Sequence, residues 1–486
     1  MSISSFTSDC GAADLAAVLS AACAERLQDP VAAPLVSVII PVYDNWEVTE
    51  RCLASVLCCD AEIPIELIVV DDASTDETPE KLSRLLGVNV LRNPVNVGFV
   101  SGCNRGAAIA RGRYLFFLNN DTHLYADSIA ALVRRIERDG DIGIVGSKLV
   151  YPDGKLQEAG GIIWSDAFAW NYGHSDDVDR PEYNFARDVD YVSGAALLVR
   201  ADLFQELGGF DERYAPAYYE DADLCFAARA RGMRVVYEPS SVVTHHGGLT
   251  AGRDVTAGMK RFYEINRPKF ESKWYDVLRQ EHYAYSEANI RRAARRRAAA
   301  QPAVLLVGST ISPDARGSNR LRVLANAFVE TGRRVACLPH DLAGVEPETR
   351  RLQNAGVEVL FSAGGDERSW EEHLTQVLPT VDAALIVGPE LCRRYLPAIL
   401  AQRDIPVLYD VAGTAPSRWD AEDLGATCIR AADGTIVGAE TEAERIVRAG
   451  FGPVAVMPAT SDPEVGAAMR LIERLVAPAV RAPAVR

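Results

Sequence analysis

Polar side chains follow short apolar segments in the first half of this sequence. The segments VSVII, IELIVV and YLFFL are each followed by residues able to bind a ligand: Pro41, Tyr43 and Asp44; Asp71 and Asp72; Asn119, Asn120 and Asp121. Continuous apolar segments indicate strands buried on both faces of a parallel sheet. Ligands bind outside the carboxyl ends of such strands. We therefore expect these groups at one edge of a sheet.

A divalent cation is the expected cofactor at this edge. Neither GxGxxG nor GxxxxGK[ST] follows a strand in this half of the chain, so no glycine-rich loop is predicted to hold phosphate. Mg²⁺ and Mn²⁺ hold a diphosphate through one or two carboxylates, and phosphate and water supply the remaining ligands. Asp121 is the candidate carboxylate.

A second acidic group stands in the segment YYEDADLCFAARARG. Glu220, Asp221 and Asp223 occupy the predicted first turn of a helix, where the helix dipole favours acidic residues. Three carboxylates within four positions exceed what capping needs. Their repulsion would raise the pKa of one of them, as a general base working near neutral pH requires. A charged first turn and a general base are both open interpretations.

The length of the chain and its alternating strand and helix patterns predict two α/β domains. A chain of 486 residues is too long for a single hydrophobic core. Strand and helix patterns alternate twice, separated by a basic helical segment. The expected parts are an N-terminal helical extension (1–34), a first α/β domain (35–280), a basic helical linker (281–302), a second α/β domain (303–462) and a C-terminal helix and tail (463–486).

Composition narrows the class of protein. Hydrophobic residues at 48% and charged residues at 24% are typical of a soluble globular chain, and a net charge of -16 argues against nucleic acid as a partner. The ten cysteines show no framework spacing, which indicates a reducing compartment. We find no signal peptide and no run of about 18 apolar residues. A cytoplasmic protein is expected.

The basic linker has two open interpretations. On a helix, neighbouring positions three and four apart bring its arginines to one face: Arg291, Arg292, Arg295 and Arg296. Charge runs are usually solvated. The alternative is peripheral docking on the anionic headgroups of the inner face of the plasma membrane.

A series of ordered motifs over about residues 36 to 275 resembles the family-two glycosyltransferases of the GT-A fold. The motifs are PVYDN, IVVDDASTDET, NVGFVSGCNRG, FLNNDT, VSGAALLVRADLF, GGFDERY, YYEDADLCFAARARG and VVTHHGG. They look most like the rhamnosyltransferase-like members that build bacterial surface polysaccharides such as O-antigen. The resemblance implies an α/β domain with a mostly parallel sheet and an inverting transfer from a UDP or dTDP sugar to a glycan or lipid-linked acceptor.

The resemblance also implies roles for individual residues. Asp221 would be the general base, and Asp121 would bind the metal. Residues expected to contact the nucleotide or the donor sugar are Pro41, Tyr43, Asp44, Asp71, Asn96, Gly98, Asn104, Asn120, Ser193 and Gly194. The acceptor side is expected to include Trp164, Trp170, Glu220 and Asp223, because aromatic faces and carboxylates suit sugar recognition, although aromatic residues are also common in cores.

The metal motif departs from the family pattern. This chain has Asn-Asn-Asp, ending at Asp121, where many members have Asp-x-Asp. A single carboxylate would hold the cation weakly, so a second protein ligand becomes more important for binding it. His245 matches a position that supplies such a ligand in related enzymes, and imidazole suits Mn²⁺. A merely hydrogen-bonded histidine near a strand end is the alternative, and His246 is another candidate ligand.

The second half resembles the N-terminal half of a GT-B glycosyltransferase, a Rossmann-like domain. The dinucleotide fingerprint is missing after its first strand, AVLLVG, so we expect a non-catalytic module that orients an acceptor, a partner or a second subunit of a homo-oligomer. Two other functions compete with glycosyl transfer for the whole chain. A sugar nucleotidyltransferase needs a glycine-rich, basic loop after the first strand, and PVYDNWEV has none. A non-catalytic scaffold with a decayed nucleotide pocket stays open.

Overall fold

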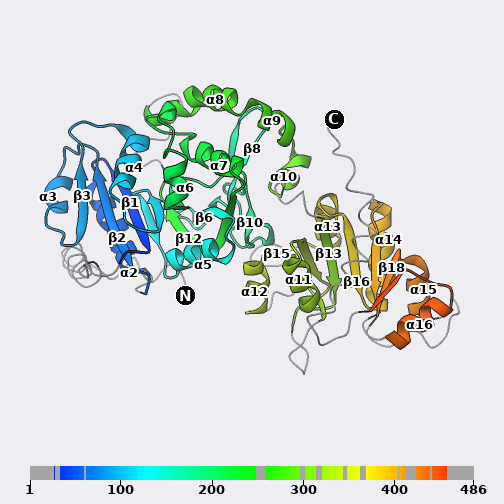
Figure 1. Ribbon diagram of the computed structural model, residues 1–486. Coiled ribbons are helices and arrows are strands. Elements are labelled where there is room, and N and C mark those ends of the chain that lie inside the picture. The colour runs from blue at the N-terminus through cyan, green and yellow to red at the C-terminus, as the bar shows by residue number, and fades with distance from the viewer. Residues whose placement is uncertain are drawn as a thin grey trace. The chain divides into compact units, whose positions relative to one another are not determined.

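The computed structural model describes residues 27, 33–59, 62–247, 258–295, 302–312, 320–342, 347–361, 368–402, 404–411, 423–437 and 440–456. The predicted tail at 463–486, and all but a few residues of the predicted extension at 1–34, lie outside these ranges. The chain divides into two compact units, Met1–Val178 with Asp188–Ala294, and Asp179–Arg187 with Arg295–Arg486 (Figure 1).

The first unit is built on a mixed sheet with the strand order β10-β12-β6-β11-β4-β1-β2-β3. Four neighbouring strands run parallel: β1 (Val36–Val42), β2 (Ile65–Asp71), β3 (Val88–Arg92) and β4 (Tyr114–Leu118). β11 (Ala196–Arg200) lies antiparallel between β4 and β6 (Ile142–Val150), while β12 (Arg234–His245) is parallel to β6. The sheet is therefore mostly parallel, as expected, with one antiparallel strand inserted near its centre.

Shorter elements complete this sheet and extend it. β5 (Thr122–Leu124) pairs antiparallel with the end of β12, and β7 (Leu156–Glu158) pairs antiparallel with β6. β8 (Gly161–Ile163) and β9 (Ala169–Asn171) form a separate antiparallel pair. β10 (Arg187–Asp188) lies next to β12 at the sheet edge.

Helices cover both faces of the first sheet (Figure 1). The helices are α2 (Trp46–Cys58), α3 (Thr78–Leu82), α4 (Gly98–Ala108), α5 (Ser128–Arg138), α6 (Ala201–Glu206), α7 (Glu220–Ala230), α8 (Arg261–Lys273), α9 (Tyr275–Glu281) and α10 (Glu287–Ala293). α2 and α5 share one apolar core with β1, β2 and β4. Ile39 and Val70 point to the other face and meet α4 at Gly106, where a Cβ would come within 2.6 Å of Ile39. Burial on both faces explains why these strands read as continuous apolar segments.

The second unit is an all-parallel α/β sheet with the order β15-β14-β13-β16-β17-β18-β19. Its strands are β13 (Ala303–Gly308), β14 (Arg334–Pro339), β15 (Val357–Val359), β16 (Ala383–Val387), β17 (Val407–Asp410), β18 (Gly434–Val437) and β19 (Val454–Val456). Its helices are α11 (Arg320–Glu330), α12 (Glu348–Ala355), α13 (Trp370–Val377), α14 (Pro389–Gln402), α15 (Leu424–Ala431) and α16 (Glu440–Arg448). Alternate residues of β13 enter two separate apolar cores, so both faces are covered.

The basic linker does not present all its arginines to solvent. Arg295 is buried, and its Nε donates to Glu358 Oε2 at 3.0 Å. That guanidinium is therefore unavailable to a lipid headgroup, while Arg296 lies outside the described residues. None of the described helices is long and apolar enough to cross a bilayer.

Candidate active site

The carboxyl ends of the first sheet open into a cavity of about 1160 Å³. Its volume exceeds the range of roughly 300–1,000 Å³ typical of small-molecule sites, so two bound molecules are sterically reasonable. The cavity brings together most of the residues that the sequence singled out: Pro41, Tyr43, Asn96, Gly98, Asn120, Asp121, Ser193, Gly194, Glu220, Asp221 and His245. Asp121 and Asp221, which are far apart in the chain, therefore face one space.

The pairing of β5 with β12 places a histidine beside the candidate metal carboxylate. His245 lies opposite Thr122 in that pairing, and its Nε2 is 3.2 Å from Asp121 Oδ1. Its Nδ1 is 2.8 Å from the side-chain oxygen of Gln157, which can only accept a hydrogen bond. Nδ1 therefore donates to Gln157, and Nε2 faces Asp121.

The surroundings of Asp121 favour its ionised form. Burial opposes its charge, but the hydrogen bond to His245 and the charge of that ring outweigh burial, so the pKa of Asp121 lies below its ordinary value. An ionised oxygen and an imidazole nitrogen aimed at each other form a donor pair suited to Mn²⁺. Among the described residues no group of three or more His, Cys, Asp or Glu is arranged to hold a metal. A cation here would need further ligands from its substrate.

The candidate base is oriented by two backbone amides. Gly194 N donates to Asp221 Oδ2 at 3.0 Å, and Ala222 N donates to Oδ1 at 2.7 Å. Burial raises the pKa of Asp221 above its ordinary value. The neighbouring carboxyl of Glu220 is buried, and burial followed by the charge of Asp221 raises its pKa well above the usual range. Asp221 thus combines fixed geometry with enhanced basicity.

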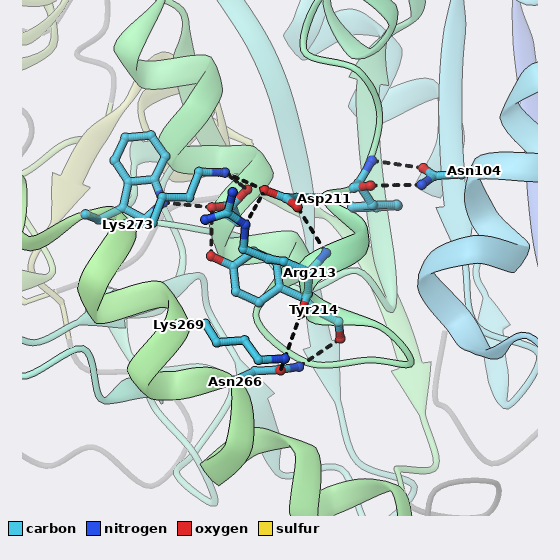
Figure 2. A network of polar contacts seen from close by, with 10 residues as sticks. Asn104, Asp211, Arg213, Tyr214, Asn266, Lys269 and Lys273 are labelled. Carbon is cyan, nitrogen blue, oxygen red and sulfur yellow. Dashed lines mark hydrogen bonds and ion pairs between the residues drawn. The ribbon is translucent and has the colours of Figure 1, made fainter.

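Strained backbone precedes this base. Tyr218 and Tyr219 both adopt left-handed conformations, with φ of 76° and 75°, immediately before α7. Such conformations cost on the order of 1–3 kcal/mol for residues other than glycine and persist only where surrounding contacts impose them. Here the side-chain amide of Asn266, on α8, donates to the carbonyls of Tyr214, Ala217 and Tyr218 at 2.8, 2.9 and 3.0 Å. Figure 2 shows Asn266 directed at this loop.

A close backbone contact joins the base's loop to the start of α4. Gly98 has φ +83°, and a Cβ on it would lie 2.4 Å from the Cβ of Pro216. Val100 N donates to the carbonyl of Pro216 at 3.1 Å. Glycine is therefore required at position 98 for conformation and for space. Gly194 differs, since a Cβ there would make only ordinary contacts of 3.5 Å with Phe99 and 3.6 Å with Asp221.

The first unit is similar to known glycosyltransferases. The model of glycosyl transferase family 2 matches residues 37–207. The PGL/p-HBAD biosynthesis glycosyltransferase of Mycobacterium bovis is 30% identical over 230 residues, which are 45% of this chain and 80% of that protein. The chain belongs to glycosyl transferase family 2. The mixed α/β sheet of its first unit is the GT-A fold expected from the sequence.

Other relatives extend the comparison. The N-acetylglucosaminyl-diphospho-decaprenol L-rhamnosyltransferase of Mycobacterium tuberculosis is 29% identical over 273 residues, 50% of this chain and 87% of that protein. This chain spans only 28% and 19% of two longer relatives. The solved structure of GalNAc-T7 with UDP, GalNAc and Mn²⁺ covers 52% of this chain and 51% of that one, at 18% identity and a TM-score of 0.42.

Several residues expected to bind the nucleotide lie outside the cavity lining of this family 2 chain. Asp44 accepts the amide of Thr75 at 2.6 Å. Asp71 accepts the amide of Ser74 at 2.8 Å and pairs with Arg92 at 2.9 Å. Both carboxylates accept hydrogen bonds in the turns at the ends of β1 and β2, and their expected role in nucleotide binding stays a prediction.

Asn104 likewise serves the protein rather than the cavity. Its amide donates to the carbonyl of Phe210 at 2.8 Å and accepts the Phe210 N–H at 2.9 Å. Figure 2 shows this two-way exchange, which ties α4 to the loop before α7. The side chain thus holds that loop and is not among the residues that line the cavity, so its expected contact with the nucleotide stays a prediction.

The structure also places several residues of the expected acceptor side away from the cavity. Asp223 is buried and accepts hydrogen bonds from Tyr214 at 3.1 Å, Lys273 at 2.7 Å and Trp274 at 2.8 Å, so it anchors α7 to α8. Trp164 is fully buried and packs 6.0 Å from Trp170, ring centre to ring centre. Neither tryptophan lines the cavity. Its aromatic lining is Tyr43, Phe99, Tyr151, Tyr191, Tyr218, Tyr219 and Tyr263.

Asp72, which the sequence placed at this edge without a role, and Glu158, which it did not single out, both line the cavity. Asp72, one position after Asp71, accepts Asn93 Nδ2 at 2.8 Å, Val97 N at 2.9 Å and Gly98 N at 2.8 Å. The Asp-Asp pair was visible, but which member faces the cavity depends on strand register. Glu158, in the segment QEAGG, also lines the cavity, and only the pairing of β7 with β6 brings it there.

Proposed function

We propose that this chain transfers a sugar from a nucleoside diphosphate sugar to a hydroxyl of a glycan or lipid-linked acceptor, with inversion at the anomeric carbon. The observation that carries the proposal is that the Asp121–His245 pair and Asp221 face the same cavity. The Asp121–His245 pair, with a bound cation, would hold the anionic leaving group, and Asp221 would accept the proton of the incoming alcohol. A single displacement between them inverts the anomeric centre.

A divalent cation, Mn²⁺ or Mg²⁺, is proposed as cofactor, bound by Asp121 and His245. When bound, it supplies positive charge for the departing nucleoside diphosphate. The hydrogen bond from His245 Nδ1 to Gln157 fixes the imidazole so that Nε2 stays available. Lys155 and Lys260 also line the cavity and can neutralise phosphate oxygens. This set replaces the glycine-rich loop that the sequence lacks.

Asp221 is proposed as the general base. Its two oxygens are held by the amides of Gly194 and Ala222, so its direction is fixed before an acceptor binds. As the acceptor oxygen forms its bond to the anomeric carbon, Asp221 takes the hydroxyl proton, and the bond to the diphosphate oxygen breaks on the opposite side. A raised pKa makes the carboxylate a better proton acceptor near neutral pH.

The proposed donor is a UDP or dTDP sugar, and the proposed pathway class is bacterial surface polysaccharide or glycolipid synthesis. The names of the two mycobacterial relatives support a glycolipid or a lipid-linked diphosphate sugar as the acceptor. Work at the cytoplasmic face of a membrane would suit such an acceptor. The second unit is proposed to be non-catalytic and to orient the acceptor or a partner.

The test is consumption of a panel of UDP, dTDP and GDP sugars by the full chain with Mn²⁺ and with a chelator. Slow hydrolysis of a donor does not require the acceptor to be known. We expect one UDP or dTDP sugar to be consumed with Mn²⁺, and consumption to stop on chelation. Asp276→Asn, on an exposed position of α9, is the control and should consume the donor normally. Absence of both binding and consumption across the panel would leave the scaffold interpretation.

A further inference from the structure

Glu158 is a buried carboxyl that has no role in the proposed sugar transfer. It ends β7, is 1% exposed, and lines the cavity that holds Asp221. Its Oε1 accepts the Ser193 amide at 3.1 Å, whereas its Oε2 is buried with no hydrogen-bond partner. A buried carboxyl oxygen without a partner is uncommon in folded proteins and calls for an explanation.

Consecutive peptide amides hold Glu158 beside the candidate base. Ser193 N donates to Glu158, and the next amide, Gly194 N, donates to Asp221. Two carboxyl groups that share a buried site do not both ionise readily. Asp221 receives two amide hydrogen bonds and Glu158 receives one, so the negative charge is better stabilised on Asp221. The proton therefore stays on Glu158.

The groups around Glu158 favour the same protonation state. Burial, and then the charge of Asp221, raises the pKa of Glu158 to about 8. Tyr191 and Cys225 also face this carboxyl, and burial raises the pKa of each above its ordinary value, so both stay neutral. At pH 7 the side chain is an uncharged acid among the residues that line the cavity, and its Oε2 is buried.

We propose that Glu158 binds substrate as a neutral acid, donating its Oε2–H to an oxygen of the sugar that lies next to Asp221. The inference rests on the proposed function, since it needs a sugar in this cavity. A site that buries a hydrogen-bond donor rejects ligands lacking the matching oxygen. Glu158 is thus a specificity-determining residue that selects for a sugar hydroxyl at that place.

The first test is the pH profile of donor consumption by the full chain. In the wild type, kcat/KM for the consumed donor falls as the pH rises through about 8, because Glu158 loses its proton there. Glu158→Gln keeps an N–H donor that does not titrate, so it should retain activity at pH 7 within several-fold and lose this alkaline decline. Glu158→Leu has no donor and should lower kcat/KM about 100-fold at pH 7.

Two results would overturn the inference. One is an alkaline decline unchanged in Glu158→Gln, and the other is Glu158→Leu as active as the wild type. If Glu158→Leu fails to fold, the Gln variant alone decides. The protonation state can be read without turnover, as the infrared carbonyl stretch of a neutral acid at pH 7 that disappears in Glu158→Gln. A wild type that consumes no donor refutes the proposed function, and an ionised Glu158 at pH 7 refutes this inference.

Discussion

The carboxyl ends of the strands differ between the two sheets, although both sheets bury apolar strands under helices. In the second unit, Asp410 at the end of β17 pairs with Arg320 at 2.8 Å, and His340 after β14 bonds to the hydroxyl of Tyr395 at 2.9 Å. In the first unit, Glu158 and Glu220 each keep a buried oxygen without a hydrogen-bond partner. Polar residues at a sheet edge are common to both units, whereas, among the residues that the structure describes, buried acid oxygens without a hydrogen-bond partner occur in the first unit alone.

This contrast teaches that position alone does not make a site. The general rule for parallel sheets points to both edges equally. What distinguishes the first edge is the combination of raised carboxyl pKa values, left-handed backbone before α7 and a histidine aimed at a carboxylate. The left-handed backbone and the raised carboxyl pKa values oppose folding locally, whereas the pairing of His245 with Asp121 stabilises the ionised carboxylate.

Removal of the base gives the largest expected effect. Asp221→Asn should lower kcat for transfer about 10²- to 10⁴-fold, because the amide cannot take the acceptor proton, while nucleotide affinity stays near normal. The measurement is steady-state kinetics together with calorimetry of nucleotide binding. Asp410→Asn in the second unit is the matched control and should retain transfer. Near-normal turnover of Asp221→Asn would assign the base elsewhere.

Removal of the amide that holds the strained loop comes next. Asn266→Ala should lower the free energy of unfolding by about 2–4 kcal/mol, because three carbonyl groups lose their hydrogen-bond donor. Chemical denaturation measures this loss. Asn89→Ala, at an exposed position of β3, should change stability by less than about 0.5 kcal/mol. Equal effects of the two variants would show that the loop holds its own conformation.

Loss of the hydrogen bond between Gln157 and His245 is expected to lower the affinity for Mn²⁺ moderately. Gln157→Leu removes the oxygen that accepts from His245 Nδ1, so the imidazole loses its fixed orientation. The affinity for Mn²⁺ in the presence of nucleotide should fall about 10- to 100-fold. Calorimetric titration with Mn²⁺ measures it. Unchanged affinity would mean that His245 does not bind the cation.

The smallest predicted effect concerns the stability of the cavity wall. The pKa of Glu158 is raised in the folded chain, so the unfolded chain binds fewer protons between the ordinary value of 4.5 and about 8, and this group destabilises the fold as pH rises through that window. Glu158→Gln should therefore raise Tm more at pH 8 than at pH 5. Thermal melts at the two pH values measure the difference. A gain independent of pH would show that Glu158 is already ionised at pH 5.

The sequence was informative where structure follows from local pattern. The segments VSVII, IELIVV and YLFFL became β1, β2 and β4, and the acids that follow them reached one edge. The pairing of strands that are far apart in the sequence could not be predicted from local pattern. Nothing local shows that β11 would insert antiparallel, or that its start would offer the Ser193 amide to Glu158. The choice between Asp71 and Asp72 depended on a single position of register.

The support given by Asn266 sets a lower limit on the size of an active fragment. The family match ends at residue 207, before the first turn of α7 and well before α8. A piece of the chain cut at that point keeps most strands of the sheet but loses Asp221, His245 and the amide that fastens their neighbourhood. Trp274, Glu281 and His282 also contact α7, through Asp223, Arg229 and Phe226. A fragment that keeps all these contacts extends to residue 282.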